Sequence, residues 1–138
     1  MNAEITIPGV PQAKQRPKFA RQGSFVRSYT PELTLNYENL VKVSWCEKTG
    51  NMKFTGALDA EVRLVFPIPK SVSKKKHAEM AAGSFPHTKK PDIDNCLKSI
   101  FDGLNGIAYE DDSQIVSVTA TKSYGETPHA WVKLTERT

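Results

Sequence analysis

The chain has 138 residues, of which 38% are hydrophobic and 25% charged, a composition typical of a soluble domain that buries its own core. No apolar run approaches the roughly 18–20 residues of a membrane span, and Met1–Val10 lacks the pattern of a signal peptide, so neither membrane insertion nor export is expected. The two cysteines, Cys46 and Cys96, show no metal-type spacing and fit a reducing, cytoplasmic setting.

Hydrophobic periodicity predicts both strands and helices along the chain. Leu58–Phe66 alternates apolar with charged residues, as a half-buried strand does, whereas the apolar residues of Ile93–Leu104 form one helical stripe. Thr30 as N-cap and Pro31 at the first helical position predict a helix start, and Gly50 ends that helix. The expected elements are, in chain order, a strand over Ala3–Ile7, a loop or mobile arm over 11–29, a helix over Pro31–Lys48, a strand over Leu58–Phe66, a short helix over Ser73–Ala82, a helix over Ile93–Leu104, and strands over Gln114–Lys122 and Ala130–Leu134.

This mixture predicts an α+β fold, in which a small mixed β-sheet packs against helices. The last two strands, joined by a turn over Ser123–Pro128, are expected to form a hairpin. No repeat or interior linker divides the chain, so residues 1–138 are expected to form a single domain.

Basic residues gather in two stretches of a chain whose formal net charge is +4. Residues 5–31 contain cations and no acid, residues 70–90 contain one acid, and together they hold 11 of the 19 Lys and Arg residues. Such stretches attract polyanions such as nucleic acids, although a solvated lysine-rich surface has the same composition. The residues expected to contact DNA are Lys14, Arg16, Lys18, Lys70, Lys74, Lys75, Lys76, Lys89 and Lys90.

An acidic block follows the second basic stretch. Asp92 and Asp94, separated by one residue at the start of a predicted helix, can bring their carboxylates towards one cation. Mg²⁺ commonly takes one or two carboxylates and keeps waters and phosphate oxygens as its other ligands. An ion held there would polarise a phosphoryl oxygen and stabilise the charge that develops during phosphodiester hydrolysis.

A lysine and a second acidic block extend this candidate site. Lys98 lies one helical turn after Asp94, where it could stabilise a transition state, protonate a leaving group or position a phosphate. The third acid is expected from Glu110-Asp111-Asp112, just ahead of a strand. Three acids that approach one another would repel without a cation, so such a cluster favours a bound metal.

Each of these residues also has a purely structural interpretation. Asp92 or Asp94 can cap a helix, because an aspartate there accepts backbone N–H groups and suits the helix dipole. Lys98 can be an i+4 partner of Asp94, and Asp111-Asp112 can be a polar turn. The residues alone leave these interpretations open.

Several other motifs fail. An EF-hand loop needs an oxygen ligand and a glycine where Cys96 and Leu97 stand, and the chain has no GxxxxGK phosphate loop and no nucleophile elbow. The histidines show no ligand spacing and are expected to be surface or loop residues; they are His77, His87 and His129.

At its acidic blocks the chain resembles the RusA family of crossover-junction endodeoxyribonucleases, the Holliday-junction resolvases of bacteria, phages and prophages. The family pattern is D-x-D-N-x-x-K, then F-D-x-L, then D-D-x-Q-(I/V)-V. The matching residues are Asp92-Ile93-Asp94-Asn95 with Lys98, Phe101-Asp102-Gly103-Leu104, and Asp111-Asp112-Ser113-Gln114-Ile115-Val116. Pro11–Phe19 and Pro67–Ser71 resemble the phage-type branch more weakly.

The resemblance implies specific roles. Asp92, Asp94 and Asp112 would be catalytic carboxylates that bind Mg²⁺, with Mn²⁺ as a candidate substitute, and Lys98 would be the catalytic lysine. The family acts as a homodimer on four-way DNA junctions and nicks two strands symmetrically, which suits a two-fold interface. No membrane partner is implied.

The leading hypothesis is therefore a magnesium-dependent, structure-selective endodeoxyribonuclease that nicks four-way junctions in DNA recombination and repair. A second hypothesis is a non-catalytic nucleic-acid-binding module whose acids serve only as caps. A third keeps the nuclease chemistry but changes the substrate to flaps, forks or duplex DNA.

Overall fold

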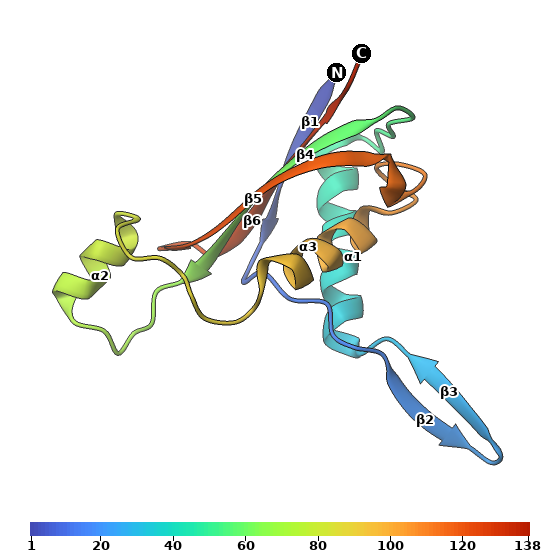
Figure 1. Ribbon diagram of the computed structural model, residues 1–138, viewed down its shortest axis with the longest axis horizontal. Coiled ribbons are helices and arrows are strands. Elements are labelled where there is room, and N and C mark those ends of the chain that lie inside the picture. Colours follow the sequence, from blue (N-terminus) through green and yellow to red (C-terminus); the bar gives the residue numbers. More distant parts are fainter.

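The strands and helices follow the periodicity of the sequence closely. The computed structural model describes residues 1–138, and Figure 1 shows the arrangement of its elements. In chain order these are β1 (Asn2–Pro8), β2 (Lys18–Gln22), β3 (Phe25–Tyr29), α1 (Glu32–Thr49), β4 (Leu58–Pro67), α2 (Lys74–Ala81), α3 (Ile93–Leu104), the 3-10 turn η1 (Asp112–Gln114), β5 (Ile115–Gly125) and β6 (His129–Glu136). The predicted α+β class is confirmed, and α1 begins one residue later than expected, with Pro31 rather than Thr30 as its N-cap.

The main sheet has the strand order β1-β6-β4-β5. β6 runs antiparallel to both of its neighbours, whereas β5 runs parallel to β4 and has no partner on its other side. The predicted hairpin between the last two strands is therefore wrong. The side chains of β6 that point into the core are completely buried, so this strand requires a central position in the sheet; they are Ala130, Val132 and Leu134. β5 is largely exposed and therefore suits the edge of the sheet.

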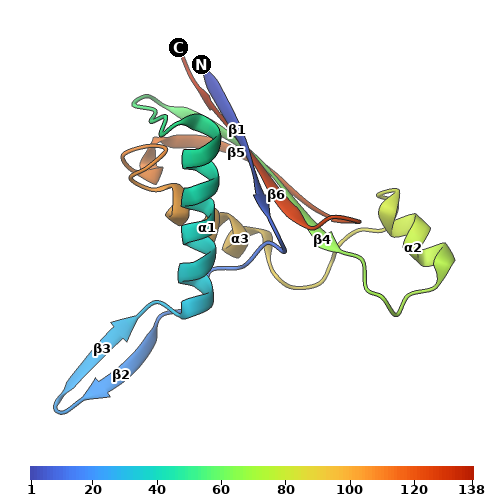
Figure 2. The ribbon, with the colours of Figure 1, turned by 180° about the vertical axis from the view of Figure 1, so that it is seen from behind.

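α1 and α3 cover one face of this sheet, as both views show (Figures 1 and 2). Gly103 of α3 lies so close to α1 that an added Cβ would stand 2.9 Å from the Cβ of Val41. The glycine therefore permits the close approach of the two helices, and the core forms between them and the sheet. The core centres on Ile5, Val41, Trp45, Phe54, Leu58, Val62, Leu64, Ile100, Leu104 and Leu134.

None of the helices is long and apolar enough to cross a membrane.

Residues 18–29 differ from the predicted loop, because β2 and β3 pair as an antiparallel hairpin that stands away from the body (Figure 1). A two-residue turn, Gly23-Ser24, joins the strands, and Gly23 has φ 62°. Two-residue hairpin turns favour glycine at a position with positive φ. The Gly-Ser pair was thus a sequence signal for this hairpin that the loop prediction missed.

Candidate active site at the start of helix α3

The amphipathic pattern of α3 determines which side chains reach solvent at its first turns. Cys96 and Ile100 are buried against the core, while Asp92, Asp94 and Lys98 are exposed. Burial raises the pKa of the Cys96 thiol to about 11, so this cysteine is a neutral core residue. The predicted acid pair and the lysine therefore share the solvent-facing flank of one helix.

The carboxylate of Asp92 does not cap the helix, although Asp92 occupies the N-cap position. No backbone N–H donates to its side chain, whose only hydrogen bond is a long one of 3.4 Å from the amide of Asn95. No ion pair joins Asp94 to Lys98 either. The first block thus presents oxygen donors and an ammonium group that the protein itself hardly engages.

A lysine from β5 positions the segment that enters this helix. The Nζ of Lys122 donates hydrogen bonds to the carbonyl oxygens of Lys89, at 2.6 Å, and Pro91, at 3.0 Å. These bonds hold the residues before Asp92 against the C-terminal end of β5. Nothing in the sequence indicated this role, because Lys122 looked like an ordinary polar residue of a strand.

The same segment rests on a stack of rings. His87 lies 4.5 Å from Phe66 and 4.7 Å from Tyr124, measured between ring centroids. Burial, together with the charge of Lys122, lowers the pKa of His87 and so favours the neutral imidazole. His87 was expected to be a surface or loop residue; it does belong to a loop, but it is buried.

The two aspartates of the second acidic block, Asp111 and Asp112, differ in their hydrogen bonding. Asp111 is the N-cap of η1 and accepts the backbone N–H of Ser113. Hydrogen bonding by the side chain and the backbone of Ser113 lowers the pKa of the Asp111 carboxyl group. Gln114 completes the capping box and donates to the carbonyl oxygens of Phe54 and Gly56. Asp112 remains exposed outside this cap, so it is the free carboxylate of the block.

The two blocks do not meet within one chain. No group of three or more His, Cys, Asp or Glu side chains lies close enough to hold a metal ion. Asp92 precedes α3 and Asp112 follows it, and a 12-residue helix is roughly 18 Å long at about 1.5 Å per residue. Likewise, Lys122 beside the first block lies roughly 23 Å along β5 from Ile115 beside the second.

Lys14, one of the predicted DNA contacts, forms ion pairs within the protein. Its ammonium pairs with Glu38 of α1 at 2.6 Å and with Asp102 of α3 at 3.0 Å. Burial alone would lower the pKa of Lys14, but the hydrogen bonds to Glu38 and Asp102 outweigh it and raise that pKa. Lys14 therefore fastens the N-terminal segment to the helices, which also explains the aspartate of the F-D-x-L motif.

The other predicted DNA contacts are exposed. Arg16 and Lys18 lie at the base of the β2–β3 hairpin, and Lys89 and Lys90 directly precede the first acidic block. Cations in the first turn of a helix interact unfavourably with the helix dipole, so the lysines in the first turn of α2 do not stabilise this helix. That turn consists of Lys74, Lys75 and Lys76.

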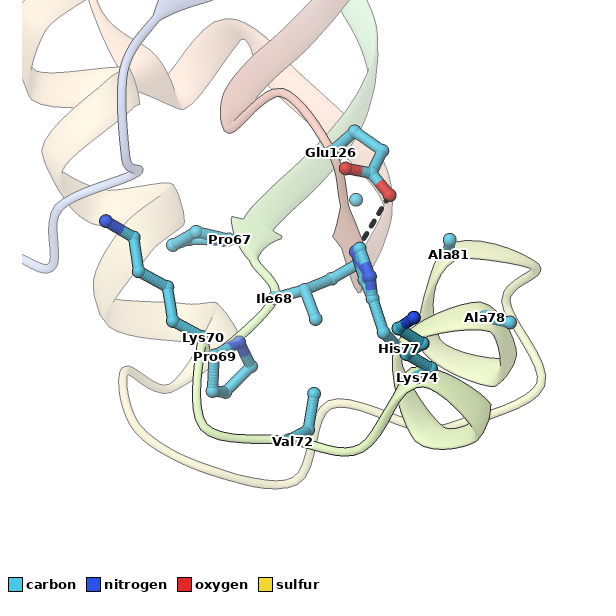
Figure 3. Close-up of a pocket in the computed structure, with 11 residues that line it drawn as sticks. Pro67, Ile68, Pro69, Lys70, Val72, Lys74, His77, Ala78, Ala81 and Glu126 are labelled. Atoms are coloured by element: carbon cyan, nitrogen blue, oxygen red, sulfur yellow. Dashed lines mark ion pairs between the residues drawn. The ribbon is translucent and has the colours of Figure 1, made fainter.

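A groove of about 630 Å³ separates α2 from the end of β4 and the β5–β6 turn (Figure 3). His77 of α2 faces Glu126 across it, with Nε2 and Oε1 3.0 Å apart. Lys70 extends away from this ion pair in the same view. The groove thus lies within the basic region, where α2 approaches the sheet.

A small α+β body that combines free carboxylates, a free lysine and basic segments has the features of a nuclease. The family model described as Endodeoxyribonuclease RusA matches residues 8–135. The chain therefore belongs to the RusA endodeoxyribonuclease family. It is also 33% identical over 135 residues to the uncharacterised protein YqaN of Bacillus subtilis, an alignment that covers 96% of this chain and 95% of that protein.

Proposed function

We propose that the protein is a divalent-metal-dependent endonuclease that nicks four-way DNA junctions. The observation that carries this proposal is the pair of free carboxylates at the start of α3, Asp92 at the N-cap and Asp94 one turn before the unpaired Lys98. Membership of an endodeoxyribonuclease family supports it. The exposed basic residues on either side of the pair give a polyanionic substrate a surface to bind.

The residues fit a hard divalent cation such as Mg²⁺. Asp92 and Asp94 offer carboxylate oxygens, the donors that Mg²⁺ prefers, and the protein does not use them to cap the helix. A bound cation supplies Lewis-acid polarisation of the scissile phosphate. Lys98 adds a fixed positive charge beside that phosphate, where negative charge increases during hydrolysis.

Asp112 belongs to the proposed site only if a second copy of the chain supplies it. Ligand oxygens lie about 2 Å from a Mg²⁺ ion, a reach far shorter than the length of α3. β5 is an edge strand that pairs with β4 on one side only, and its Val116 is 53% and its Val118 44% exposed, which is unusual for an edge that faces only water. Antiparallel pairing of β5 with its symmetry mate, in the register that sets the start of one strand opposite Lys122 of the other, would place Asp112 of the partner subunit beside the first block.

Substitution of Asp94 tests the catalytic proposal. We expect Asp94→Asn to abolish nicking of a synthetic four-way junction in Mg²⁺ while junction binding survives, because a surface carboxylate adds no affinity for a polyanion. Full cleavage by this variant would contradict the proposal. A panel of four-way junctions, flaps, forks and linear duplex, with Mg²⁺ or Mn²⁺, identifies the substrate, and cleavage of none of them favours a binding module.

Subunit mixing tests the shared site. A heterodimer of Asp94→Asn and Asp112→Asn subunits contains one intact site if Asp112 acts across the interface, so mixing two inactive variants should restore roughly a quarter of the wild-type nicking. Mixing Asp92→Asn with Asp94→Asn is the matched control, and it should restore nothing. If the first mixture also stays inactive while heterodimers form, Asp112 does not act in the partner's site.

The basic helix α2 has its own test. Replacing Lys74, Lys75 and Lys76 with glutamine should weaken junction binding and reduce the slope of log affinity against log salt by up to about three. The measurement is a salt titration of binding by fluorescence anisotropy. An unchanged slope would show that these lysines only solvate the surface.

A further inference from the structure

The β2–β3 hairpin exposes more apolar surface than a solvated arm requires. Figures 1 and 2 show that it projects from the body near the start of α1. Phe25 beside its turn is 76% exposed, Phe19 71% and Val26 69%. A two-stranded hairpin with no layer packed on it is marginal in water, so a partner that covers these side chains would also order the hairpin.

The apolar groups lie on both faces of the hairpin. Residues directly opposite in antiparallel strands share a face, and successive residues alternate between faces. Phe19 and Arg21 are two residues apart in β2 and share a face, and Val26 lies opposite Arg21. Phe19 and Val26 therefore lie on the same face. Phe25, opposite Gln22, lies on the other. A hairpin that docked on a protein surface would need one apolar face, whereas this one is suited to a partner that surrounds it.

The positive charge of the hairpin indicates a polyanion as this partner. The hairpin carries Lys18, Arg21 and Arg27, and residues 5–31 contain no acid. A second copy of this chain, with a formal net charge of +4, is a poor match for such an arm. Nucleic acid presents phosphates to cations on either side and base faces to aromatic rings, and aromatic stacking accepts any base.

The hairpin is also connected to the proposed site. The backbone N–H of Lys14 donates to the carbonyl oxygen of Asn95 in the first turn of α3, at 2.9 Å. The turn at Gly23 lies nine residues further along, within roughly 30 Å of that anchor even when extended. DNA bound at Asp94 is therefore within reach of the hairpin.

We infer that the hairpin inserts into the branch point of the DNA, where Phe25 stacks on an exposed base and the arginines contact the flanking phosphates. This inference rests on the proposed action on branched DNA and adds a determinant of its structure selectivity. At a branch point base stacking is already interrupted, so opening a gap for an aromatic ring costs less there than within a duplex.

The test uses a four-way junction with 2-aminopurine at the crossover, without divalent metal, so that binding is observed and cleavage is not. Wild-type protein should change the 2-aminopurine fluorescence at the crossover but not that of the same base within a linear duplex. The Phe25→Ala variant should not show this fluorescence response. Its affinity for the junction should fall about tenfold, while its affinity for duplex DNA should change by less than about twofold. Phe25→Trp should keep both the response and the junction affinity.

Val43→Ala is the matched control, because Val43 is an exposed apolar residue on α1, outside the hairpin. An unchanged fluorescence response in Phe25→Ala, or an equal loss of junction and duplex binding, would overturn the inference. Loss of self-association in Phe25→Ala, measured by sedimentation, would overturn it in favour of a second copy as the partner. Nicking in Mg²⁺, assayed in parallel, separates the two proposals: a fluorescence response without cleavage leaves the hairpin assignment intact and refutes the nuclease.

Discussion

The two acidic blocks of the protein use their helix-cap positions in opposite ways. Asp92 occupies the N-cap of α3 without accepting a backbone N–H, whereas Asp111 caps η1 and accepts the N–H of Ser113. Asp112, its neighbour, stays outside that cap. A cap position by itself therefore does not make an aspartate structural, and only its hydrogen bonds distinguish a capping carboxylate from one free to bind a ligand.

The largest expected effect comes from comparing neighbours in the second block. Asp112→Asn should lower the nicking rate at least about a hundredfold if Asp112 acts in the proposed site, because the substitution removes a negative charge there, while thermal stability hardly changes. Asp111→Asn should do the reverse, lowering the melting temperature and leaving nicking within a few fold. Nicking assays and thermal unfolding of both variants test these different roles. Equal loss of nicking in both variants would contradict the assignment of Asp111 to structure and of Asp112 to catalysis.

The capping role of Asp111 also predicts a pH dependence. Its folded-state pKa lies below the ordinary 3.8, so its stabilisation is present above that pH and is lost as the pH falls through the folded-state value. The difference in melting temperature between wild type and Asp111→Asn should therefore disappear on acidification. A difference that is constant across this range would contradict the capping assignment.

α3 separates the two blocks, and Gly103 determines how closely it packs on α1. Gly103→Ala should lower the free energy of unfolding by about 1–3 kcal/mol, because the new methyl group overlaps Val41. The double variant Gly103→Ala/Val41→Ala relieves this overlap, although it loses apolar contacts of its own. Chemical denaturation measures both, and a neutral Gly103→Ala would show that the helices can separate freely.

Lys122 positions only the first block. Lys122→Met keeps the length of the side chain but removes the hydrogen bonds to the carbonyl oxygens of Lys89 and Pro91, so we expect nicking to fall about tenfold, chiefly in kcat. Lys122→Arg, which retains donors, should recover part of the rate. An equal change in junction affinity would instead identify Lys122 as a DNA contact.

The smallest effect is expected at Lys14. Lys14→Gln should lower stability by about 1 kcal/mol, since partial exposure screens its ion pairs, and should leave the salt dependence of DNA binding unchanged. Arg16→Gln should change that salt dependence instead. Because the pKa of Lys14 is raised, its stabilisation persists below the ordinary value of 10.5 and is lost as the pH rises through the folded-state value.

Much of the fold was predictable because periodicity reports burial directly. The alternation in β4 and the apolar stripe of α3 specify which faces enter the core, and both elements lie where the sequence placed them. The hairpin expected between β5 and β6 failed because adjacency along the chain does not determine strand pairing. Burial of the inward residues of β6 required a place between β1 and β4.

The candidate site shows the same division. The sequence by itself identified Asp92, Asp94 and Lys98 as neighbours, because residues within two turns of a helix start stay together whatever the rest of the chain does. Only the structure showed that Lys14 is held in ion pairs, that Asp111 is a cap, and that the block of Asp112 does not return to the first block to form a cluster of acids. The ion pairs of Lys14 and the separation of the two blocks depend on residues distant in sequence, which local spacing does not encode. The cap formed by Asp111 is local, but it rests on a hydrogen bond that the residue types alone leave open.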